Sequence, residues 1–275
     1  MTAMITRRST FGALIAGVVA PLMVGCQSLP PARPAATSEL NVVTSGGFNA
    51  AFDTLATRYT AETGTRIVTG HGPSMGETPN AIPARLARGE AADVVILARS
   101  GLDRLVADGK VARGTEIDLG LSKIAVAVRA GAAVPDISTP DALRATLIAA
   151  KSVAWSDSAS GVYIQTSMLA RLGIADQVTP KGRMIPATPV GEIVARGDAE
   201  IGFQQLSELQ PVKGIRIVGL LPDSLQKVTV FSGGIVAYSP RLREARALLT
   251  YLSSPSADAA IRASGLEPAP RKARP

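Results

Sequence analysis

The sequence contains one cysteine, one histidine and one tryptophan, and aromatic residues make up only 4% of it. With a single cysteine, Cys26, the chain cannot form an intrachain disulfide, so a hydrophobic core must hold its fold. One cysteine and one histidine also exclude the usual zinc sites, which need several such ligands. The sequence has no phosphate-binding Walker loop, dinucleotide fingerprint or Gly-x-Ser-x-Gly elbow. It therefore predicts no metal and no cofactor.

Long apolar runs are also missing, because no segment reaches the roughly 20 residues that a helix needs to cross a bilayer. The uncharged apolar stretch 11–25 follows Arg7 and Arg8 and precedes Cys26. This order is typical of an export leader and predicts a periplasmic protein. The Arg-Arg pair leaves the general secretory and twin-arginine routes both open.

The net charge of +7 raises the question of nucleic-acid binding. Five of the positive residues lie at the two ends of the chain, and they are Arg7, Arg8, Arg271, Lys272 and Arg274. The remaining chain has little net charge, few aromatic residues and no basic stripe. We therefore expect no nucleic-acid partner. We also expect the protein to be a monomer.

Short β-rich runs alternate with helical patterns along the chain. The predicted strands are 40–44, 66–69, 93–97, 123–128, 152–155, 201–204, 215–218 and 228–238. The predicted helices are 48–63, 79–88, 139–150, 161–172, 190–196 and 241–252. This alternation indicates an α/β fold built from βαβ units, with a largely parallel sheet.

The organisation along the chain indicates two lobes, because about 230 residues remain after the leader. The expected parts are a leader at 1–25, a spacer at 26–38, a first lobe from 39–120 plus 232–268, a second lobe at 121–231, and a basic Pro-rich tail at 269–275. The chain would then cross between the lobes twice, near 119–123 and near 228–233.

Four predicted strand-to-helix junctions, 44–47, 71–76, 156–161 and 188–191, share a composition of serine, threonine, glycine and proline. Helix starts at the carboxyl ends of strands present free N–H groups, glycine permits close approach, and hydroxyls donate hydrogen bonds. Each serine or threonine is alternatively an ordinary N-cap, worth about 1 kcal/mol. Four similar junctions favour a cleft for a small anion. The candidate ligand-binding residues are Ser45, Gly46, Gly47, Ser74, Met75, Ser158, Ser160, Gly161 and Val190.

Two ionisable residues lie in these junctions. His71 is the only histidine of the chain, and it is either a structural residue or one that faces the ligand. Asp157 would repel an anion unless it is protonated or paired, so we expect it to cap the helix that starts near Gly161.

The sequence resembles the periplasmic molybdate-binding family of solute-binding proteins over most of 39–267. The resemblance rests on the turn 44–47, on 91–96, on Ser160-Gly161-Val162-Tyr163 and on the unit from Val190-Gly191 to Ile201-Gly202-Phe203. It implies a type II periplasmic-binding fold, in which two α/β lobes joined by a two-crossing hinge close on the ligand. The segment 22–26 resembles a bacterial lipoprotein box, although Met23 departs from it. That box implies acylation of Cys26 and a membrane anchor, whereas an ordinary cleaved leader is the alternative.

The resemblance also suggests how the ligand is held. Serine hydroxyls and backbone amides that hold the family's oxyanion correspond by position to Ser45, Ser74, Ser160 or Gly161, and Val190. The family's tyrosine is replaced here by Gln204 or Gln205, which weakens a molybdate assignment. The segments 71–76, 156–161 and 203–205 are more similar to a side branch in which aconitate isomerases occur. In that branch His71 would shuttle the proton.

Two functions remain open at this stage. We favour a periplasmic receptor that binds a small anion, an oxyanion or a small polycarboxylate, and delivers it to an ABC permease. The alternative is an aconitate isomerase on the same fold, which would need a proton carrier over the substrate carbon and donors for its carboxylates.

Overall fold

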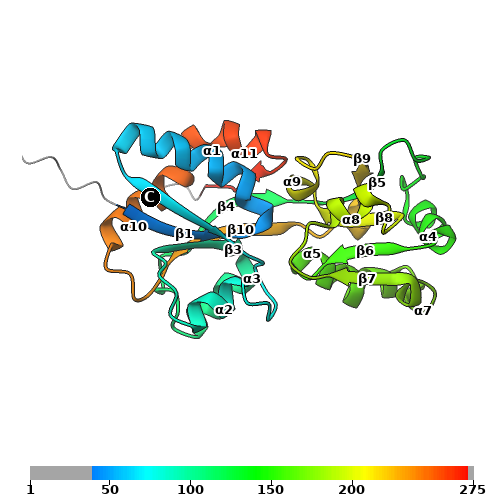
Figure 1. The fold of residues 1–275 in the computed structure, drawn as a ribbon, viewed down its shortest axis with the longest axis horizontal. Coiled ribbons are helices and arrows are strands. Elements are labelled where there is room, and N and C mark those ends of the chain that lie inside the picture. Colours follow the sequence, from blue (N-terminus) through cyan, green and yellow to red (C-terminus); the bar gives the residue numbers. More distant parts are fainter. Residues whose placement is uncertain (1–38, 272–275) are drawn as a thin grey trace, which may run out of the picture. The chain divides into compact units, whose positions relative to one another are not determined.

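Two mixed β-sheets organise residues 39–271, the part of the chain that this computed structural model describes (Figure 1). These residues lie within one compact unit, Thr37–Pro275. The predicted leader, the lipidation residue Cys26, the spacer and the last four residues of the predicted tail lie outside the described residues.

The first sheet has six strands in the order β11-β4-β10-β3-β1-β2. Its strands are β1 (Glu39–Thr44), β2 (Arg66–His71), β3 (Val94–Ala98), β4 (Ile117–Ser122), β10 (Thr229–Ile235) and β11 (Glu267–Pro268). Strand β1 pairs in parallel with β2 and β3, whereas β10 runs antiparallel to β3 and β4. We refer to this sheet and its helices as lobe 1.

Helices cover both faces of the sheet in lobe 1 (Figure 1). One face packs against α1 (Gly46–Thr63), α10 (Leu242–Leu252) and α11 (Asp258–Ala263), and the other against α2 (Ile82–Ala87) and α3 (Arg99–Ala107). Alternate residues of β3 belong to different cores, with Ile96 on the α1 side and Leu97 on the α3 side. Both faces of this strand are therefore buried, which explains its continuous apolar sequence.

The second sheet has five strands in the order β7-β6-β8-β5-β9. Its strands are β5 (Ile124–Arg129), β6 (Val153–Ser156), β7 (Gly182–Ile185), β8 (Ile201–Gln205) and β9 (Ile215–Leu220). Strand β6 is parallel to β7 and β8, and β5 is antiparallel to β8 and β9. Both sheets are thus mixed rather than largely parallel, because the strands next to the crossings run against their neighbours. This sheet and its helices are called lobe 2.

The helices of lobe 2 also lie on both faces of its sheet. The face that carries Trp155 and Phe203 packs against α4 (Pro140–Ala149), α5 (Ala159–Tyr163), α6 (Leu169–Arg171) and α7 (Ala175–Val178), and the other against α8 (Val190–Arg196) and α9 (Leu206–Leu209). The helix predicted at 161–172 is interrupted by a π-helical turn, Ile164–Met168. Short 3-10 turns occupy Thr179–Lys181, Asp223–Leu225 and Pro255–Ala257.

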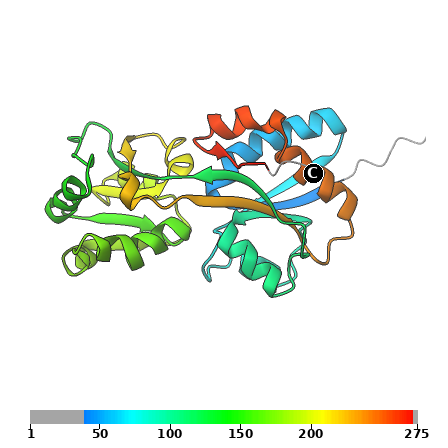
Figure 2. The ribbon, with the colours of Figure 1, turned by 180° about the vertical axis from the view of Figure 1, so that it is seen from behind.

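The chain passes between the sheets twice, as the predicted fold requires. Only Lys123 separates β4 from β5, and residues 221–228 return the chain from β9 to β10 (Figure 2). Sequence periodicity did not predict the helices α3, α7, α9 and α11 or the strands β4, β7 and β11. Helix α3 follows β3 directly, with Ala98 as its N-cap, so no turn residue signals the change.

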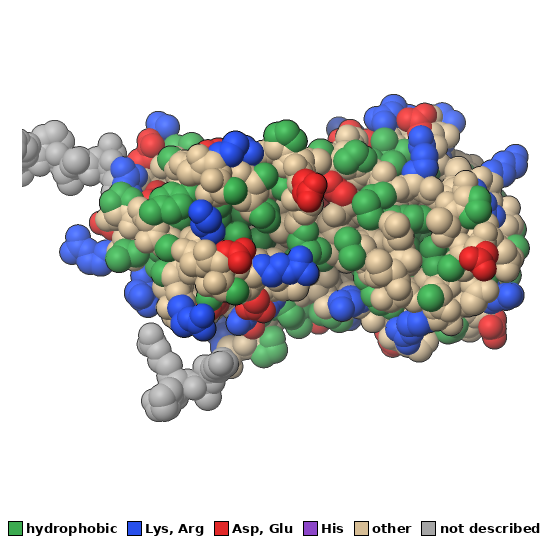
Figure 3. Space-filling model, turned by 90° about the horizontal axis from the view of Figure 1, so that it is seen from below, with side chains coloured by type: hydrophobic (Ala, Val, Ile, Leu, Met, Phe, Trp, Pro, Cys, Tyr) green, Lys and Arg blue, Asp and Glu red, His purple; other side chains and the backbone are tan. Residues whose placement is uncertain are grey.

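Charged side chains of both signs are interspersed on the face of the described residues that Figure 3 displays. That face carries no uniform positive surface of the kind that nucleic acids contact. Among residues 39–271, no helix is both long and apolar enough to cross a membrane.

Candidate functional site

A polar cavity of about 240 Å³ lies between the two lobes. It is lined by Gly46, Asn49, His71, Gly72, Pro73 and Asn80 of lobe 1 and by Ser156, Asp157, Ser158, Ala187, Thr188, Pro189, Gln204 and Glu208 of lobe 2. Pockets for drug-sized ligands measure roughly 300–1,000 Å³, so this interlobe cavity suits a smaller ligand. Within the described part of the chain, no group of three or more His, Cys, Asp or Glu side chains is placed to hold a metal ion.

The two candidate serines of lobe 1 are brought together beside the interlobe cavity. The Ser74 hydroxyl donates to Ser45 Oγ at 2.8 Å, and the Ala98 backbone N–H donates to Ser74 Oγ at 3.0 Å. Both serines are buried, and Ser45, the N-cap residue of α1, makes no side-chain cap hydrogen bond. The Ser45 side chain therefore does not act as an ordinary N-cap of α1. Its hydroxyl instead ties the β1 and β2 junctions together.

The junction after β6 has a comparable arrangement in lobe 2. The Ser156 and Ser160 hydroxyls lie 3.2 Å apart, and Ser158, which lines the cavity, is the N-cap residue of α5. Gly161 does not line the cavity. A side chain there would collide with the Ser156 carbonyl, so a steric requirement of the α5 turn explains this glycine.

The glutamines that end β8 point in different directions. Gln204 lines the cavity, and its Oε1 accepts a 2.8 Å hydrogen bond from the Val190 backbone N–H. Gln205 lies outside the cavity wall and donates through Nε2 to Thr229 Oγ1 at 2.9 Å. The candidate amide of Val190 is thus already paired with a side chain of its own lobe.

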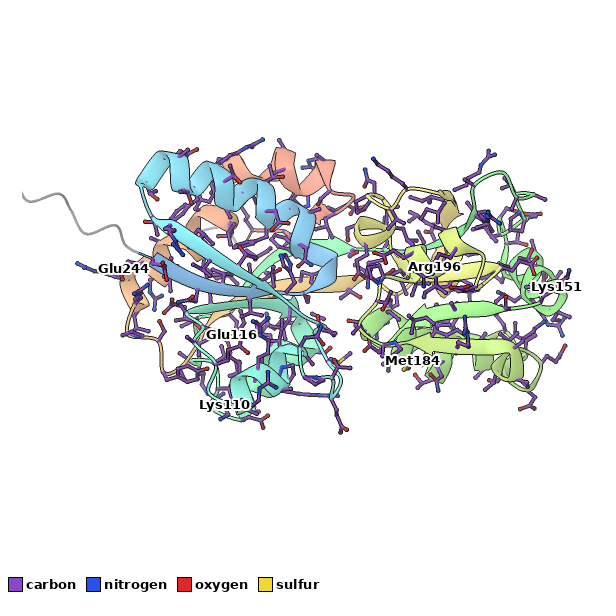
Figure 4. The ribbon with its side chains drawn as sticks, viewed as in Figure 1. Lys110, Glu116, Lys151, Met184, Arg196 and Glu244 are labelled. Carbon is purple, nitrogen blue, oxygen red and sulfur yellow. The ribbon has the colours of Figure 1, made fainter. Side chains whose placement is uncertain are left out.

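Met75 lies in a second, adjoining hollow rather than in the interlobe cavity. This hollow also contains Met184, an exposed side chain of β7 that Figure 4 labels, and it shares Asp157 with the cavity. Because Met75 and Met184 are apolar, this hollow differs in character from the polar cavity.

His71 ends β2 and lies in the cavity wall. Its side chain is 46% exposed, and Nε2 lies 3.9 Å from Asp53 Oδ1 on α1. None of the described residues that line the cavity is lysine or arginine. His71 is therefore the side chain of this wall that is able to carry a positive charge.

Asp157 does not cap the helix near Gly161, contrary to our expectation. Helix α5 begins earlier, at Ala159, and the Asp157 carboxylate accepts the Ala187 backbone N–H at 3.3 Å. Ala187 has a φ of 56°, and among the described residues it is the only non-glycine residue whose backbone lies in the left-handed region. Burial raises the pKa of Asp157, opposed in part by the Ala187 hydrogen bond. Asp157 therefore helps to hold an unfavourable turn in the cavity wall.

Glu208 on α9 is a cavity residue that sequence reasoning missed. Burial raises its pKa to about 7, and hydrogen bonds from the Gln204 side chain and the Gln205 backbone oppose this, while the charge of Asp157 adds to it. The carboxyl lies over Gly46 at the start of α1, where any side chain would collide with it. The sequence did contain a signal for Glu208, because this residue follows the same strand end as the candidates Gln204 and Gln205.

A buried contact between the lobes fixes the position of α9. The Ser207 hydroxyl donates to the Gly47 carbonyl of α1 at 2.7 Å. Gly47 leaves no room for a side chain of its own, since one would collide with Phe231. The first turn of α1 and the four residues of α9 therefore meet directly, and Glu208 projects from this junction into the cavity.

Comparison with known proteins identifies a sequence family and a relative of this chain. The sequence model described as bacterial extracellular solute-binding protein matches residues 40–267. A protein of a Pseudomonas species named aconitate isomerase is 51% identical over 249 residues, which cover 90% of this chain and 94% of that protein.

Solved structures agree on the fold. The periplasmic molybdate-binding protein of Azotobacter vinelandii superposes with a TM-score of 0.69 at 23% identity, covering 84% of this chain and all of that one. The sulfate-binding protein SubI of Mycobacterium tuberculosis H37Rv gives a TM-score of 0.66 at 18% identity, covering 84% and 87%. At these identities the likeness establishes the two-lobed type II periplasmic-binding fold, as predicted, and leaves the ligand open.

Proposed function

Because this chain belongs to the bacterial extracellular solute-binding protein family, we propose that its interlobe cavity binds a small tricarboxylate and interconverts cis- and trans-aconitate. The observation that carries this proposal is the meeting of two proton-carrying side chains, His71 and Glu208, in one small polar cavity. The relative that is 51% identical and bears the name aconitate isomerase supports it.

The isomerisation moves a proton along an allylic unit, from the methylene carbon to the far alkene carbon. It needs a group that takes up and returns a proton, together with hydrogen-bond donors for the carboxylates. Asn49, Asn80 and Thr188 supply side chains with donors to the cavity wall. Asn49 Oδ1 is buried with no hydrogen-bond partner in the described structure, so this acceptor is open to a donor group of a ligand rather than to a carboxylate.

A receptor that delivers a small anion to an ABC permease is the second candidate. It is supported by the family and by the position of the cavity between two lobes, because closure of such lobes around a ligand is sufficient for a receptor. A receptor has no need of a proton carrier in the cavity. The two candidates therefore differ in whether the bound ligand is chemically changed.

Incubation of the purified mature chain with each aconitate isomer, followed by NMR, tests the proposal. Both isomers are expected to reach the same final ratio. His71→Ala is expected to lower kcat/KM by about 10- to 100-fold, because one charged hydrogen bond to the substrate is lost. In parallel, a thermal-shift panel of molybdate, sulfate, citrate and aconitate identifies the ligand, since a ligand at 100 times its Kd adds about 2.7 kcal/mol. A melt shifted by aconitate without interconversion would favour the receptor.

We also propose that the mature chain is tethered to a membrane through an acyl group on Cys26. The family indicates export, and the anchor itself rests on the sequence 22–26. Cys26→Ser is expected to move the protein from the membrane fraction to the soluble periplasmic fraction, with loss of incorporated radiolabelled palmitate. Wild-type protein that is soluble and unlabelled would contradict the anchor.

A further inference from the structure

The charge of the interlobe cavity is unusual for a site that receives a polyanion. Its titratable side chains are His71 from β2, Asp157 from the turn after β6 and Glu208 from α9. Two of these three are acids, and none of the described lining residues carries the fixed charge of lysine or arginine. An acid in such a place works against anion binding, so its presence calls for another role.

Glu208 occupies the most tightly defined position of the three. Its neighbour Ser207 is hydrogen-bonded to the Gly47 carbonyl of the other lobe, and Gln204 links the Glu208 carboxyl to the Val190 amide. The absence of a side chain at Gly46 leaves room for the carboxyl. Both lobes therefore contribute to placing this group, which is the arrangement expected for a group that must meet a substrate atom at a set distance.

His71 is placed differently. Its ring is 46% exposed, and the Asp53 carboxylate, 3.9 Å away, is itself 56% exposed. The ring is thus both partly exposed to solvent and part of the cavity wall, so it is suited to pairing with a substrate carboxylate. The two proton-carrying groups of the cavity are thus suited to different tasks.

We propose that the Glu208 carboxylate removes the proton from the methylene carbon of the bound tricarboxylate, and that His71 supplies positive charge to a substrate carboxylate. This assignment rests on the proposed isomerase function. It makes Glu208 the catalytic residue of the allylic shift and His71 a binding residue.

The step balances without any further reactant. Glu208 takes the methylene proton as the C–H bond breaks, and that electron pair forms the new carbon–carbon double bond. The electron pair of the original double bond takes a proton at the far carbon, and this proton comes from the Glu208 carboxyl. The product is the other geometric isomer, and Glu208 returns to its ionised form.

Glu208→Gln separates catalysis from binding. Loss of a general base is expected to lower kcat by about 10²- to 10⁴-fold. The Kd for trans-aconitate, measured by calorimetry, is expected to stay equal or to fall, because one negative charge leaves the cavity. His71→Gln is expected to give the opposite pattern, with a raised Kd and a smaller loss of kcat.

The matched control is Glu192→Gln, an exposed glutamate of α8 in the same lobe, which is expected to keep wild-type kcat and Kd. If wild-type protein turns over aconitate and Glu208→Gln does so equally fast, the assignment of Glu208 is wrong and the proposed function stands. If wild-type protein does not turn over aconitate, the proposed function is wrong, and the assignment of Glu208 is wrong with it.

Gly46→Ala provides a second test, because it moves the Glu208 carboxyl without changing its chemistry. The new methyl group would collide with the Glu208 carboxyl and displace it, while Gly46 has a backbone conformation that alanine adopts. A displacement of about 1 Å can cost roughly 100-fold in rate, so a kcat loss of at least about tenfold is expected in a variant that binds aconitate and folds by circular dichroism. Wild-type kcat in this variant would overturn the assignment.

Discussion

Replacing Glu208 by glutamine is expected to stabilise the protein at pH 8 by about 1–3 kcal/mol and to leave its stability at pH 4.5 almost unchanged. Burial raises the pKa of Glu208 from its usual 4.5 to about 7, so the folded state holds this proton more tightly than the unfolded state. Wild-type stability therefore falls as the pH rises from about 4.5 to about 7, and above pH 7 the full cost of this partly buried charge is present. Glutamine does not ionise and avoids that cost.

Urea denaturation of both proteins at pH 4.5 and pH 8 measures this effect. Glu192→Gln serves as the control, because Glu192 is exposed in the first turn of α8. Its loss removes a favourable interaction with the helix dipole, so the control is expected to be less stable at pH 8 by no more than about 1 kcal/mol. A Glu208→Gln variant that is destabilised at pH 8 would show that the charged carboxyl is a structural ion rather than a poised proton carrier.

Gly161→Ala is expected to destabilise the fold by about 3 kcal/mol or more. The added methyl group would collide with the carbonyl oxygen and carbon of Ser156, which are backbone atoms in a tight strand-to-helix turn. Backbone cannot move aside as a flexible side chain does. Serines 156 and 160, whose hydroxyls meet in this turn, would be separated.

Gly219→Ala in β9 is the matched comparison, since a methyl group there makes an ordinary contact with Ile137. It is expected to change the midpoint of denaturation little, whereas Gly161→Ala lowers it strongly. Equal midpoints for the two variants would mean that the turn after β6 adapts easily. In that case the glycine would need a functional explanation after all.

The sequence was sufficient to predict two α/β lobes and most elements, because buried strands such as β3 and β5 and amphipathic helices such as α1 leave clear periodic patterns. It did not predict the mixed strand directions. Strand direction depends on how β5 and β10 pair across a crossing, and pairing leaves no local periodicity.

Each of the four predicted junctions contributes residues to the wall of the interlobe cavity, whereas other candidate residues of the same junctions do not line it. Composition led to His71, Gly46, Ser158 and Gln204, which do line the interlobe cavity. Composition treats every serine and glycine of a junction alike, so it could not show that Ser45 and Ser74 pair with each other or that Gly161 meets a steric need.

Glu208 was missed for a different reason. An acid in a cleft expected to bind an anion looks unfavourable from sequence alone, and Glu208 lies on a helix of only four residues. Its importance comes from the contact between α9 and α1 in the folded protein, which joins residues 160 positions apart.

The measurement that tests this account most directly is an NMR time course of trans-aconitate with the wild-type protein in deuterium oxide. We expect the vinyl signal of cis-aconitate to appear and to approach the ratio reached from the cis side, and Glu208→Gln to slow this change by about 10²- to 10⁴-fold while still binding the ligand. A wild-type protein that binds trans-aconitate and leaves its methylene protons and its geometry unchanged for hours would contradict the account.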